Sequence, residues 1–277
     1  MTIAKERIDV LLVEQGFYES RVKAKAALMA GLVLVDGERI EKSGMKVPRT
    51  ANIIVKGAVH PYVSRGGLKL EKAIRQFELN LEGAVMIDIG ASTGGFTDCA
   101  LQNGASYVYA VDVGYNQLDW SLRQDERVNV MERTNFRYTV PEDLTGPQPT
   151  FATIDVSFIS LKLILPTLGT LLHHGAGVVA LIKPQFEAGR EKVGKSGVVR
   201  EPSVHREVLA QVLTMAAQEG FSLQHLTFSP ITGGEGNIEF LAHWLWEPGS
   251  SKAAPSEDAI AAVVKEAGST FAQDSKH

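Results

Sequence analysis

The chain has 277 residues, of which 44% are hydrophobic and 22% charged, which is typical of a globular protein with one large core and a small second domain. Its single cysteine, Cys99, excludes an intramolecular disulfide framework and favours a reducing compartment, so we expect a cytoplasmic protein. The longest stretch without Asp, Glu, Lys or Arg, residues 163–182, contains proline and glycine and is not expected to cross a membrane.

The net charge of −4 is unevenly distributed along the chain. Residues 1–60 carry 10 Lys and Arg against 7 Asp and Glu, whereas the rest of the chain carries 18 against 25. A basic N-terminal part beside an acidic remainder favours binding of a polyanion through the N-terminus.

Two helices and a hairpin are predicted in the N-terminal part. Residues 8–16 have apolar positions at helical spacing and end at a glycine. Residues 20–31 begin at Ser20, a favourable N-cap, and also end at a glycine. Residues 32–40 predict two short strands around the turn Asp36-Gly37.

The second of these helices begins with three cations, Arg21, Lys23 and Lys25. Positive charge at a helix start opposes the helix dipole, so another interaction is expected to favour it there. A phosphate-binding edge and a solvated face are equally good interpretations from charge alone.

The order of residues in this part resembles the RNA-binding domain first named from ribosomal protein S4. The matching pattern is Arg7-x-Asp9-x-x-Leu12, Ser20-Arg21-x-x-Ala24 and Gly31-x-Val33-x-Val35-x-Gly37. The resemblance implies that this domain binds structured RNA. The contact edge that it suggests is Ser20, Arg21, Lys23 and Lys25, with Lys46 and Arg49 as its extension and Arg7 as a further RNA-binding residue.

From residue 83 onward, predicted strands and helices alternate, which favours a doubly wound α/β sheet. The predicted strands cover residues 84–92, 107–114, 128–135, 149–158 and 177–184, and the helices between and after them cover 94–105, 117–125, 161–172 and 201–220. Residues 221–231 and 237–246 predict an antiparallel pair that reverses one edge of the sheet.

The domain boundaries follow from these elements. We expect an RNA-binding domain over residues 1–60, a linker over 61–67 and the α/β domain over 68–248. Residues 249–277 lose the pattern and are expected to form a flexible tail, with room for one short amphipathic helix over 257–267.

A glycine-rich loop follows the first predicted strand of the α/β domain. Gly90, Gly94 and Gly95 have neither the dinucleotide nor the triphosphate spacing, and no lysine follows to meet phosphate. Asp88 precedes the loop and suits a cationic ligand, and Asp112 ends the next strand, where an acid accepts from ribose hydroxyls. This favours S-adenosylmethionine, whose sulfonium and amino group are cationic and which has no phosphate. The alternative is a structural turn in which Asp88 is a cap.

Two features that the sequence lacks narrow the choice of the chemical group that would accept a methyl. Cys99 lies inside a predicted helix, which disfavours the cysteine-dependent methylation of cytosine carbon. The segment 155–158 reads DVSF and lacks the prolines typical of adenine amino methylation. Instead, Asp155 and Lys183 stand at the carboxyl ends of neighbouring predicted strands, where α/β proteins bind ligands.

With Lys69 and Glu239, these two residues form an ordered Lys-Asp-Lys-Glu set that resembles the FtsJ-like ribose 2′-O-methyltransferases. Together with the N-terminal domain, the whole chain resembles the TlyA family, some members of which carry a haemolysin label. The matching phrases are SRGGLKL, DIGASTGGFTD, AVDVGYNQLDW, TNFR, IDVSFISL, LIKPQFEAGR, GVVREPSVH and GNIEF, within residues 5–245.

This resemblance implies a Rossmann-like methyltransferase sheet that methylates the ribose of cytidine in ribosomal RNA of the small subunit, the large subunit or both. It implies S-adenosylmethionine as the cofactor and no metal. The cofactor-binding residues that it suggests are Asp88, Gly90, Ser92, Gly94, Gly95, Phe96, Asp112, Asn135 and Asp155, with Asn135 near the adenine.

A ribose 2′-hydroxyl is a poor nucleophile and must lose its proton as it attacks. We hypothesise that Lys183 is the general base or aligns the hydroxyl, that Lys69 is a neighbouring cation, and that Asp155 and Glu239 orient both amines. From the lysine alone, an ion pair of Lys183 with Glu187 or Glu239 at the sheet edge is the alternative.

The polar loop over residues 186–201 carries Arg190, Lys192 and Lys195 and is expected to contact RNA or to close over the site. A solvated loop is the alternative. For the whole chain, the competing interpretations are a non-enzymatic ribosomal-RNA-binding factor and a membrane-active haemolysin. We expect ribosomal subunits as partners and no membrane, and the sequence gives no prediction of the oligomeric state.

Overall fold

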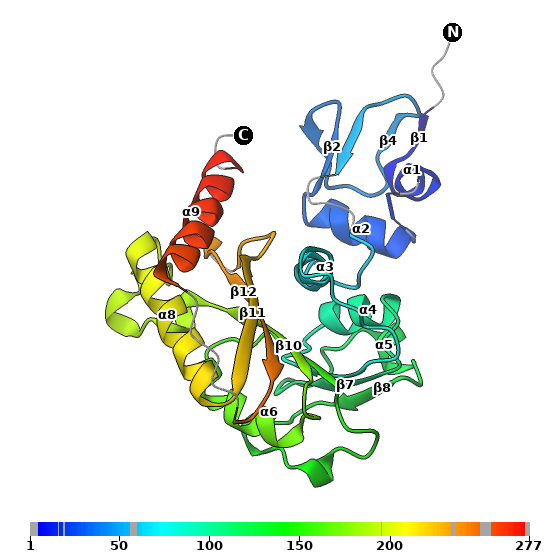
Figure 1. The fold of residues 1–277 in the computed structure, drawn as a ribbon. Coiled ribbons are helices and arrows are strands. Elements are labelled where there is room, and N and C mark those ends of the chain that lie inside the picture. Colours follow the sequence, from blue (N-terminus) through cyan, green and yellow to red (C-terminus); the bar gives the residue numbers. More distant parts are fainter. Residues whose placement is uncertain are drawn as a thin grey trace. The chain divides into compact units, whose positions relative to one another are not determined.

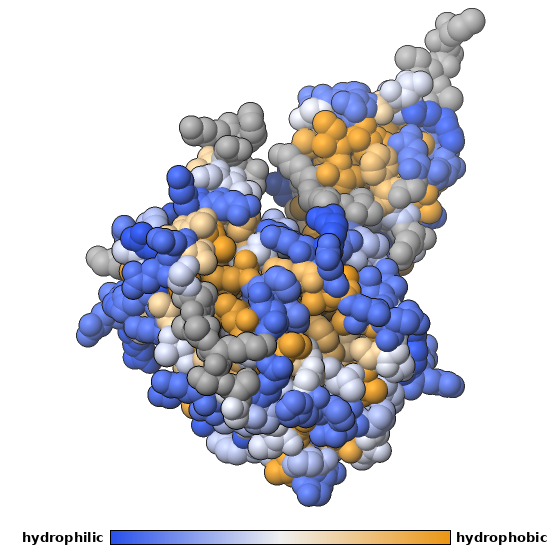
Figure 2. All heavy atoms as spheres, in the orientation of Figure 1, coloured by the Kyte–Doolittle hydropathy of each residue, from blue (hydrophilic) through white to orange (hydrophobic). Residues whose placement is uncertain are grey.

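The computed structural model describes residues 5–15, 17–18, 20–55, 60–194, 196–233, 236–249 and 256–274. The chain forms two compact units, Met1–Pro61 and Tyr62–His277, each with its own buried apolar residues (Figure 1). The boundary falls one residue after the predicted end of the first domain. On the face drawn in Figure 2, hydrophilic side chains cover most of the second unit and hydrophobic ones gather in smaller groups.

The first unit is a small α+β domain. Its elements are β1 (Lys5–Arg7), α1 (Ile8–Glu14), α2 (Arg21–Met29), β2 (Val33–Val35), β3 (Glu38–Arg39), β4 (Lys46–Pro48) and β5 (Ile53–Val55). β2 lies between β3 and β5 in an antiparallel sheet, and β1 pairs with β4. Both predicted helices are present, although Gly16 lies outside the described residues. The predicted Asp36-Gly37 turn joins β2 to β3, and both residues have positive φ angles, 53° and 87°.

The second unit contains a seven-stranded sheet in the order β11-β12-β10-β9-β6-β7-β8. The strands are β6 (Val85–Ile89), β7 (Tyr107–Val111), β8 (Val128–Met131), β9 (Phe151–Ile154), β10 (Gly177–Ile182), β11 (Phe221–Phe228) and β12 (Phe240–Trp246). β12 pairs antiparallel with both β10 and β11, and the remaining pairs are parallel. The predicted doubly wound sheet with one reversed edge is therefore confirmed.

Helices cover both faces of this sheet. The α-helices are α3 (Gly67–Gln76), α4 (Gly95–Gln102), α5 (Trp120–Arg123), α6 (Leu165–Leu171), α7 (Pro184–Glu187), α8 (Pro202–Gln218) and α9 (Glu257–Asp274). Short 3₁₀ turns are η1 (Phe136–Tyr138), η2 (Pro141–Asp143), η3 (Leu161–Leu163) and η4 (Arg190–Lys192).

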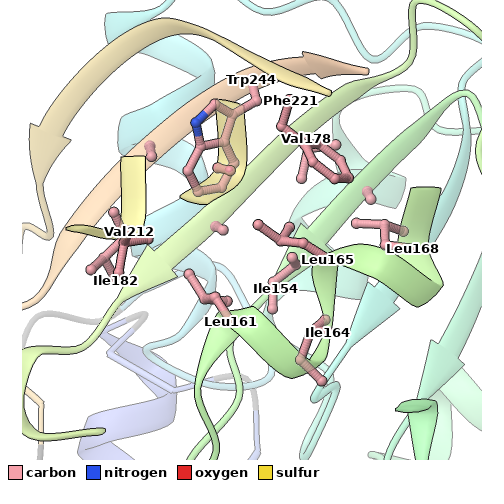
Figure 3. Close-up of a cluster of buried hydrophobic side chains, with 14 of the residues drawn as sticks. Ile154, Leu161, Ile164, Leu165, Leu168, Val178, Ile182, Val212, Phe221 and Trp244 are labelled. Atoms are coloured by element: carbon pink, nitrogen blue, oxygen red, sulfur yellow. The ribbon is translucent and has the colours of Figure 1, made fainter. Parts of the chain in front are cut away.

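Strand β10 shows why the sheet is buried on both sides. All six of its residues are buried, and alternate residues belong to different apolar clusters. Val178 and Ile182 pack with side chains from α6, α8 and β12, including Leu165, Val212 and Trp244 (Figure 3). Side chains from α3 and α4 form the cluster on the other face. The continuous apolar run that predicted this strand reflects burial on both faces.

In the segment expected to be a flexible tail with room for a short helix over 257–267, the structure has a longer helix, α9, which spans Glu257–Asp274. Ile260, Val264 and Ala267 are buried against the rest of the second unit, and the Phe271 ring lies 6.0 Å from that of Phe228. The apolar positions of this helix recur at helical spacing, which indicates an amphipathic helix but does not show what that face packs against.

The expected linker over 61–67 is also corrected by the structure. Tyr62 and Gly67 are buried in the second unit, and the Val63 backbone N–H donates to Asp98 Oδ2 at 2.7 Å. Contacts with α3 also hold Tyr62: its hydroxyl donates to Glu71 Oε1 at 3.0 Å, and its ring packs so closely on Gly67 that a Cβ there would lie 2.4 Å away. The segment therefore belongs to the second unit.

Candidate active site

Four charged residues meet where the central strands of the seven-stranded sheet end. Asp155 directly follows β9 and Lys183 directly follows β10, so both lie at carboxyl ends of neighbouring parallel strands. Glu239 directly precedes β12, and the antiparallel register places the start of β12 beside the end of β10. Lys69 comes from the first turn of α3. The structure thus brings together all four residues of the predicted set.

The four side chains form a row of alternating charges. Lys69 Nζ lies 2.8 Å from Glu239 Oε2 and 3.1 Å from Asp155 Oδ2. Lys183 Nζ lies 2.5 Å from Asp155 Oδ1 and donates to Ser157 Oγ at 3.1 Å. Asp155 therefore bridges the two amines, and Lys183 stands at the end of the row.

This arrangement differs from the alternative in which Lys183 pairs with Glu187 or Glu239. Glu187 accepts hydrogen bonds from the Ser160 hydroxyl at 2.6 Å and from the Leu161 backbone at 2.8 Å. The carboxylate of Glu239 faces Lys69. The ion pair of Lys183 is with Asp155 instead.

Burial and the ion pairs together determine the protonation of Lys69 and Asp155. Lys69 is 8% exposed, Lys183 7% and Glu239 2%. Burial by itself lowers the pKa of Lys69, but the nearby carboxylates of Asp155 and Glu239 outweigh it and raise the pKa above its ordinary value. Burial likewise opposes ionisation of Asp155, but Lys69 and Lys183 together hold its pKa below the ordinary value. Lys69 is therefore a fixed cation and Asp155 a fixed anion.

The row borders a cavity of about 570 Å³ within the second unit. Lys69, Asp155, Lys183 and Glu239 all line it. The remaining lining residues are Ser64, Arg65, Gly66, Gly90, Ala91, Ser92, Gly95, Phe96, Ser157, Phe158, Gln185, Phe186, Val193, Ser196, Gly197, Gly233 and Asn237.

Four predicted cofactor residues of the glycine-rich segment line this cavity: Gly90, Ser92, Gly95 and Phe96. Gly90 has a φ angle of 86°, and a Cβ there would lie 2.5 Å from the Asp155 carbonyl oxygen. A side chain at Gly90 would therefore strain the backbone and collide with the neighbouring strand end. The absence of side chains at Gly90 and Gly95 leaves bare backbone at the cavity wall.

Asp88 does not line the cavity. It is fully buried, and its two oxygens accept hydrogen bonds from Thr97 Oγ1 at 2.7 Å and Thr153 Oγ1 at 2.8 Å. Burial raises the pKa of Asp88 to about 6, although the threonine hydrogen bonds act in the opposite direction. This geometry supports the structural alternative, in which Asp88 ties β6 to α4 and β9, and it does not support contact with a cationic ligand.

Three other predicted cofactor residues lie outside the cavity lining. Asp112 accepts from the Ser92 backbone at 2.8 Å and from the Gly114 backbone at 2.7 Å, so its carboxylate is fixed beside the glycine-rich loop. Gly94 precedes α4 with a φ angle of 98°. Asn135 caps η1 by accepting from the Arg137 backbone at 3.3 Å. Contact of these residues with a cofactor stays a prediction.

In the first unit, the predicted RNA contacts fall into two groups. Arg7 and Arg21 pair with the fully buried Asp9, at 2.9 and 2.8 Å, and these pairs hold the pKa of Asp9 at about 2. Ser20 caps α2 by accepting from the Lys23 backbone at 3.3 Å. These three predicted contacts therefore have structural roles, whereas Lys23, Lys25 and Lys46 are exposed.

The cations predicted in the loop after α7 differ in their surroundings. Arg190 is exposed in η4, and Lys192 forms an ion pair with Glu207 of α8. Lys195 lies outside the described residues. Val193, Ser196 and Gly197 line the cavity, so the loop borders the site, and its contact with RNA or closure over the site stays a prediction.

Three of the cavity-wall residues that sequence reasoning missed are Phe158, Gln185 and Asn237. Phe158 is 91% exposed despite its size, has a φ angle of 64° and lies 5.0 Å from the Phe186 ring. Gln185 lines the cavity beside Lys183. Asn237 accepts from the Val199 backbone at 3.1 Å and donates to the Gly197 carbonyl at 3.0 Å, which fastens the loop to the segment before β12. Each lies within three residues of a predicted catalytic residue, and that proximity was the available signal.

Comparison with known proteins decides the family. The model of the FtsJ-like methyltransferase family matches residues 62–244, and the model of the S4 domain matches residues 6–53. The chain belongs to the TlyA family of FtsJ-like methyltransferases. The resemblance expected from sequence is thereby confirmed.

Three relatives show how far this similarity extends. The chain is 60% identical to the "Putative rRNA methyltransferase YqxC" of Bacillus subtilis, over 98% of this chain and 97% of that protein. It is 39% identical to the "16S/23S rRNA (cytidine-2'-O)-methyltransferase TlyA" of Mycobacterium tuberculosis, over 95% of this chain and 98% of that protein. A solved structure, "Putative hemolysin from Streptococcus thermophilus", is 54% identical over the whole of both chains with a TM-score of 0.80.

Family membership makes S-adenosylmethionine the cofactor. The residues present fit it, because the bare backbone at Gly90 and Gly95 gives a close approach and the fixed carboxylate of Asp112 stands beside that loop.

Among the described residues, no group of His, Cys, Asp and Glu is arranged to hold a metal ion. In the same residues, no helix has the length and apolar character needed to cross a membrane.

Proposed function

We propose that the protein transfers a methyl group from S-adenosylmethionine to the ribose 2′-hydroxyl of a cytidine in ribosomal RNA. The single observation that carries this proposal is the buried row Glu239–Lys69–Asp155–Lys183 beside a glycine-walled cavity. The name of the mycobacterial relative, a cytidine 2′-O-methyltransferase of 16S and 23S ribosomal RNA, supports the substrate.

The two lysines of the row have different roles in this proposal. Lys69 is held as a cation by two carboxylates, so it orients Asp155 and Glu239 and does not exchange a proton. Lys183 has one carboxylate partner and one hydroxyl partner, Ser157. The ribose hydroxyl takes a place beside Lys183 Nζ, where the amine aligns the hydroxyl or accepts its proton.

S-adenosylmethionine supplies a methyl group on a sulfonium that leaves readily. The protein then has mainly to bring the 2′-oxygen in line with that methyl group, and proximity and orientation provide most of the acceleration. In this proposal Asp112 accepts from the ribose hydroxyls of the cofactor, Asn135 lies near its adenine, and Ser92 and Phe96 complete the binding wall.

RNA is held by the first unit through its exposed lysines, with Arg190 adding a contact beside the cavity. Small or large ribosomal subunits, or both, are the partners, and the protein acts in the cytoplasm, where they are found. The phosphate backbone provides the attraction, so binding should weaken as salt rises.

Labelled S-adenosylmethionine and purified ribosomal subunits test this function. Small and large subunits from a strain without the gene are incubated with the protein, and the RNA is digested to nucleosides. We expect label in 2′-O-methylcytidine, and none when the subunits come from a strain that carries the gene, because their site is already modified. Label on a base, or no transfer to either subunit despite cofactor binding, would overturn the proposal.

A further inference from the structure

Gln185 is a polar residue of the cavity that the proposed mechanism does not use. It lies in α7, two residues after Lys183, and lines the same cavity as that lysine. In the part of the chain that the structure describes, its Oε1 atom is buried and has no hydrogen-bond partner. A buried amide oxygen without a donor is unfavourable, so its presence at a cavity points to a donor on a ligand.

The position of Gln185 indicates which ligand brings that donor. The sheet order β10-β9-β6 separates the loop after β10 from the glycine-rich loop after β6. Gln185 therefore follows a strand that is separated by β9 from the strand before Gly90, and in the proposed function this is the side of the methyl acceptor and not of the cofactor.

Two aromatic side chains accompany Gln185 on this side. Phe158 and Phe186 have ring centroids 5.0 Å apart and an interplanar angle of 50°, and both line the cavity. Phe158 is 91% exposed, so its ring is open to a ligand. Proteins that bind single-stranded RNA place unstacked bases against such rings and read the base edge with polar groups.

We propose that Gln185 selects the target base, with Oε1 accepting a hydrogen bond from the exocyclic N4 amino group of cytosine. Cytosine presents a donor at this position, whereas uracil presents the O4 acceptor. An acceptor in the protein therefore favours cytidine and leaves uridine with two facing acceptors. This inference rests on the proposed function, since it concerns the nucleotide whose ribose is methylated.

The test compares two substrates and four proteins. The substrates are ribosomal subunits without the modification that carry either the natural cytidine or a uridine at the mapped target position. The proteins are the wild type, Gln185→Met, Gln185→Glu and the control Gln211→Met, which removes an amide from the exposed face of α8. Methionine keeps the length but has no strong acceptor, and glutamate can only accept. Affinity for S-adenosylmethionine is measured for each protein.

We expect the wild type and Gln211→Met to favour the cytidine substrate in kcat/KM. Gln185→Met should lose about tenfold to hundredfold of this preference while its cofactor affinity is unchanged. Gln185→Glu should keep the preference, because its carboxylate still accepts from the N4 amino group.

Each contrary result has a distinct meaning. If wild-type protein methylates neither substrate, the proposed function fails. If it methylates cytidine and Gln185→Met keeps the full preference, only the role of Gln185 is overturned. If Gln185→Glu loses the preference together with Gln185→Met, the amide acts as a donor and the proposed acceptor role is wrong.

Discussion

At the residue scale, Lys69 and Lys183 are chemically identical but have different surroundings. Lys69 lies between Asp155 and Glu239, whereas Lys183 contacts Asp155 and the hydroxyl of Ser157. Two buried carboxylates depend on Lys69, and only Asp155, which keeps Lys69 as a partner, depends on Lys183. Stability and activity should therefore separate between the two lysines.

Replacement of each lysine by methionine should reveal this separation. Lys69→Met leaves Asp155 and Glu239 buried without their shared cation and should lower the free energy of unfolding by about 3–5 kcal/mol. Lys183→Met should lower it by less than about 2 kcal/mol, because Asp155 keeps a partner. Both variants should lose methyl transfer. Urea denaturation measures the stabilities, and an equal loss in the two variants would contradict the assignment of Lys69 as the shared cation.

Asp88 should give the stability a dependence on pH that Asp88→Asn lacks. Its pKa in the folded chain is raised to about 6, above the value of about 3.9 expected after unfolding. The folded state therefore holds the proton more tightly, and stability falls as pH rises from about 4 to about 6. Relative to Asp88→Asn, the wild type should lose about 3 kcal/mol across this window.

The measurement for Asp88 is the difference in unfolding free energy between wild type and Asp88→Asn at several pH values. Taking the difference removes groups that titrate in both proteins. A constant difference between pH 4 and pH 7 would show that the buried carboxyl does not take up a proton in the folded chain.

At the scale of elements, what could be predicted depended on how strongly burial shapes the sequence. β10 is buried on both faces, so its apolar run was continuous and the strand was predicted correctly. The buried positions of α9, Ile260, Val264 and Ala267, form a stripe that suggested only a short helix over 257–267 within a tail, so the full length and the packing of α9 were not predicted. The direction of a single side chain was harder still, since nothing in the sequence showed that Asp88 meets Thr97 and Thr153 instead of the cavity.

The conformation of the glycine-rich loop requires a glycine at position 90, and a substitution there tests this requirement. Gly90→Ala places a Cβ 2.5 Å from the Asp155 carbonyl oxygen at a positive φ angle. The clash should shift the loop and lower the affinity for S-adenosylmethionine at least tenfold, an order-of-magnitude expectation for a loss above about 1.4 kcal/mol. Gly175→Ala is the matched control, because Gly175 has a φ angle of 81° and no atom within 4 Å of its added Cβ.

Calorimetric titration with the cofactor compares the two glycine variants. Both carry the backbone strain of a positive φ angle, so both should lose some stability. Only Gly90→Ala should lose cofactor affinity. Equal affinity in the two variants would show that the loop around Gly90 is not the cofactor wall.

At the scale of the whole molecule, the sequence separated a basic first unit from an acidic second unit, and the structure adds which cations are exposed. Arg7 and Arg21 are engaged by Asp9, while Lys25 and Lys46 are exposed. The meeting of Lys69, Asp155, Lys183 and Glu239 could be predicted because the last three stand at strand ends and the order of all four resembles that of the FtsJ-like family, whereas their catalytic role stays a proposal. Gln185 and Phe158 were not predicted: their nearness in sequence to Lys183 and Asp155 was the available signal, and the cavity that they line is formed by segments far apart in the chain.

Reversing one exposed charge of the first unit should weaken binding to ribosomal subunits but not cofactor binding. In the proposed function Lys25 contacts a phosphate, so Lys25→Glu should lower the affinity and decrease the slope of log affinity against log salt by about 1. Lys265→Glu, with the same charge change on an exposed position of α9, is the control. Identical salt slopes for the two variants would exclude Lys25 from the RNA contact.

The most direct test of the central claim is the location of the transferred methyl group in wild-type and Lys183→Met reactions. Subunits without the modification are incubated with labelled S-adenosylmethionine, and the nucleosides are separated. The account predicts label in 2′-O-methylcytidine for the wild type and at least a hundredfold less for Lys183→Met, an order-of-magnitude expectation for loss of a group that aligns or deprotonates the hydroxyl. Cofactor affinity and folding should be retained in the variant. Undiminished transfer by Lys183→Met would contradict the account.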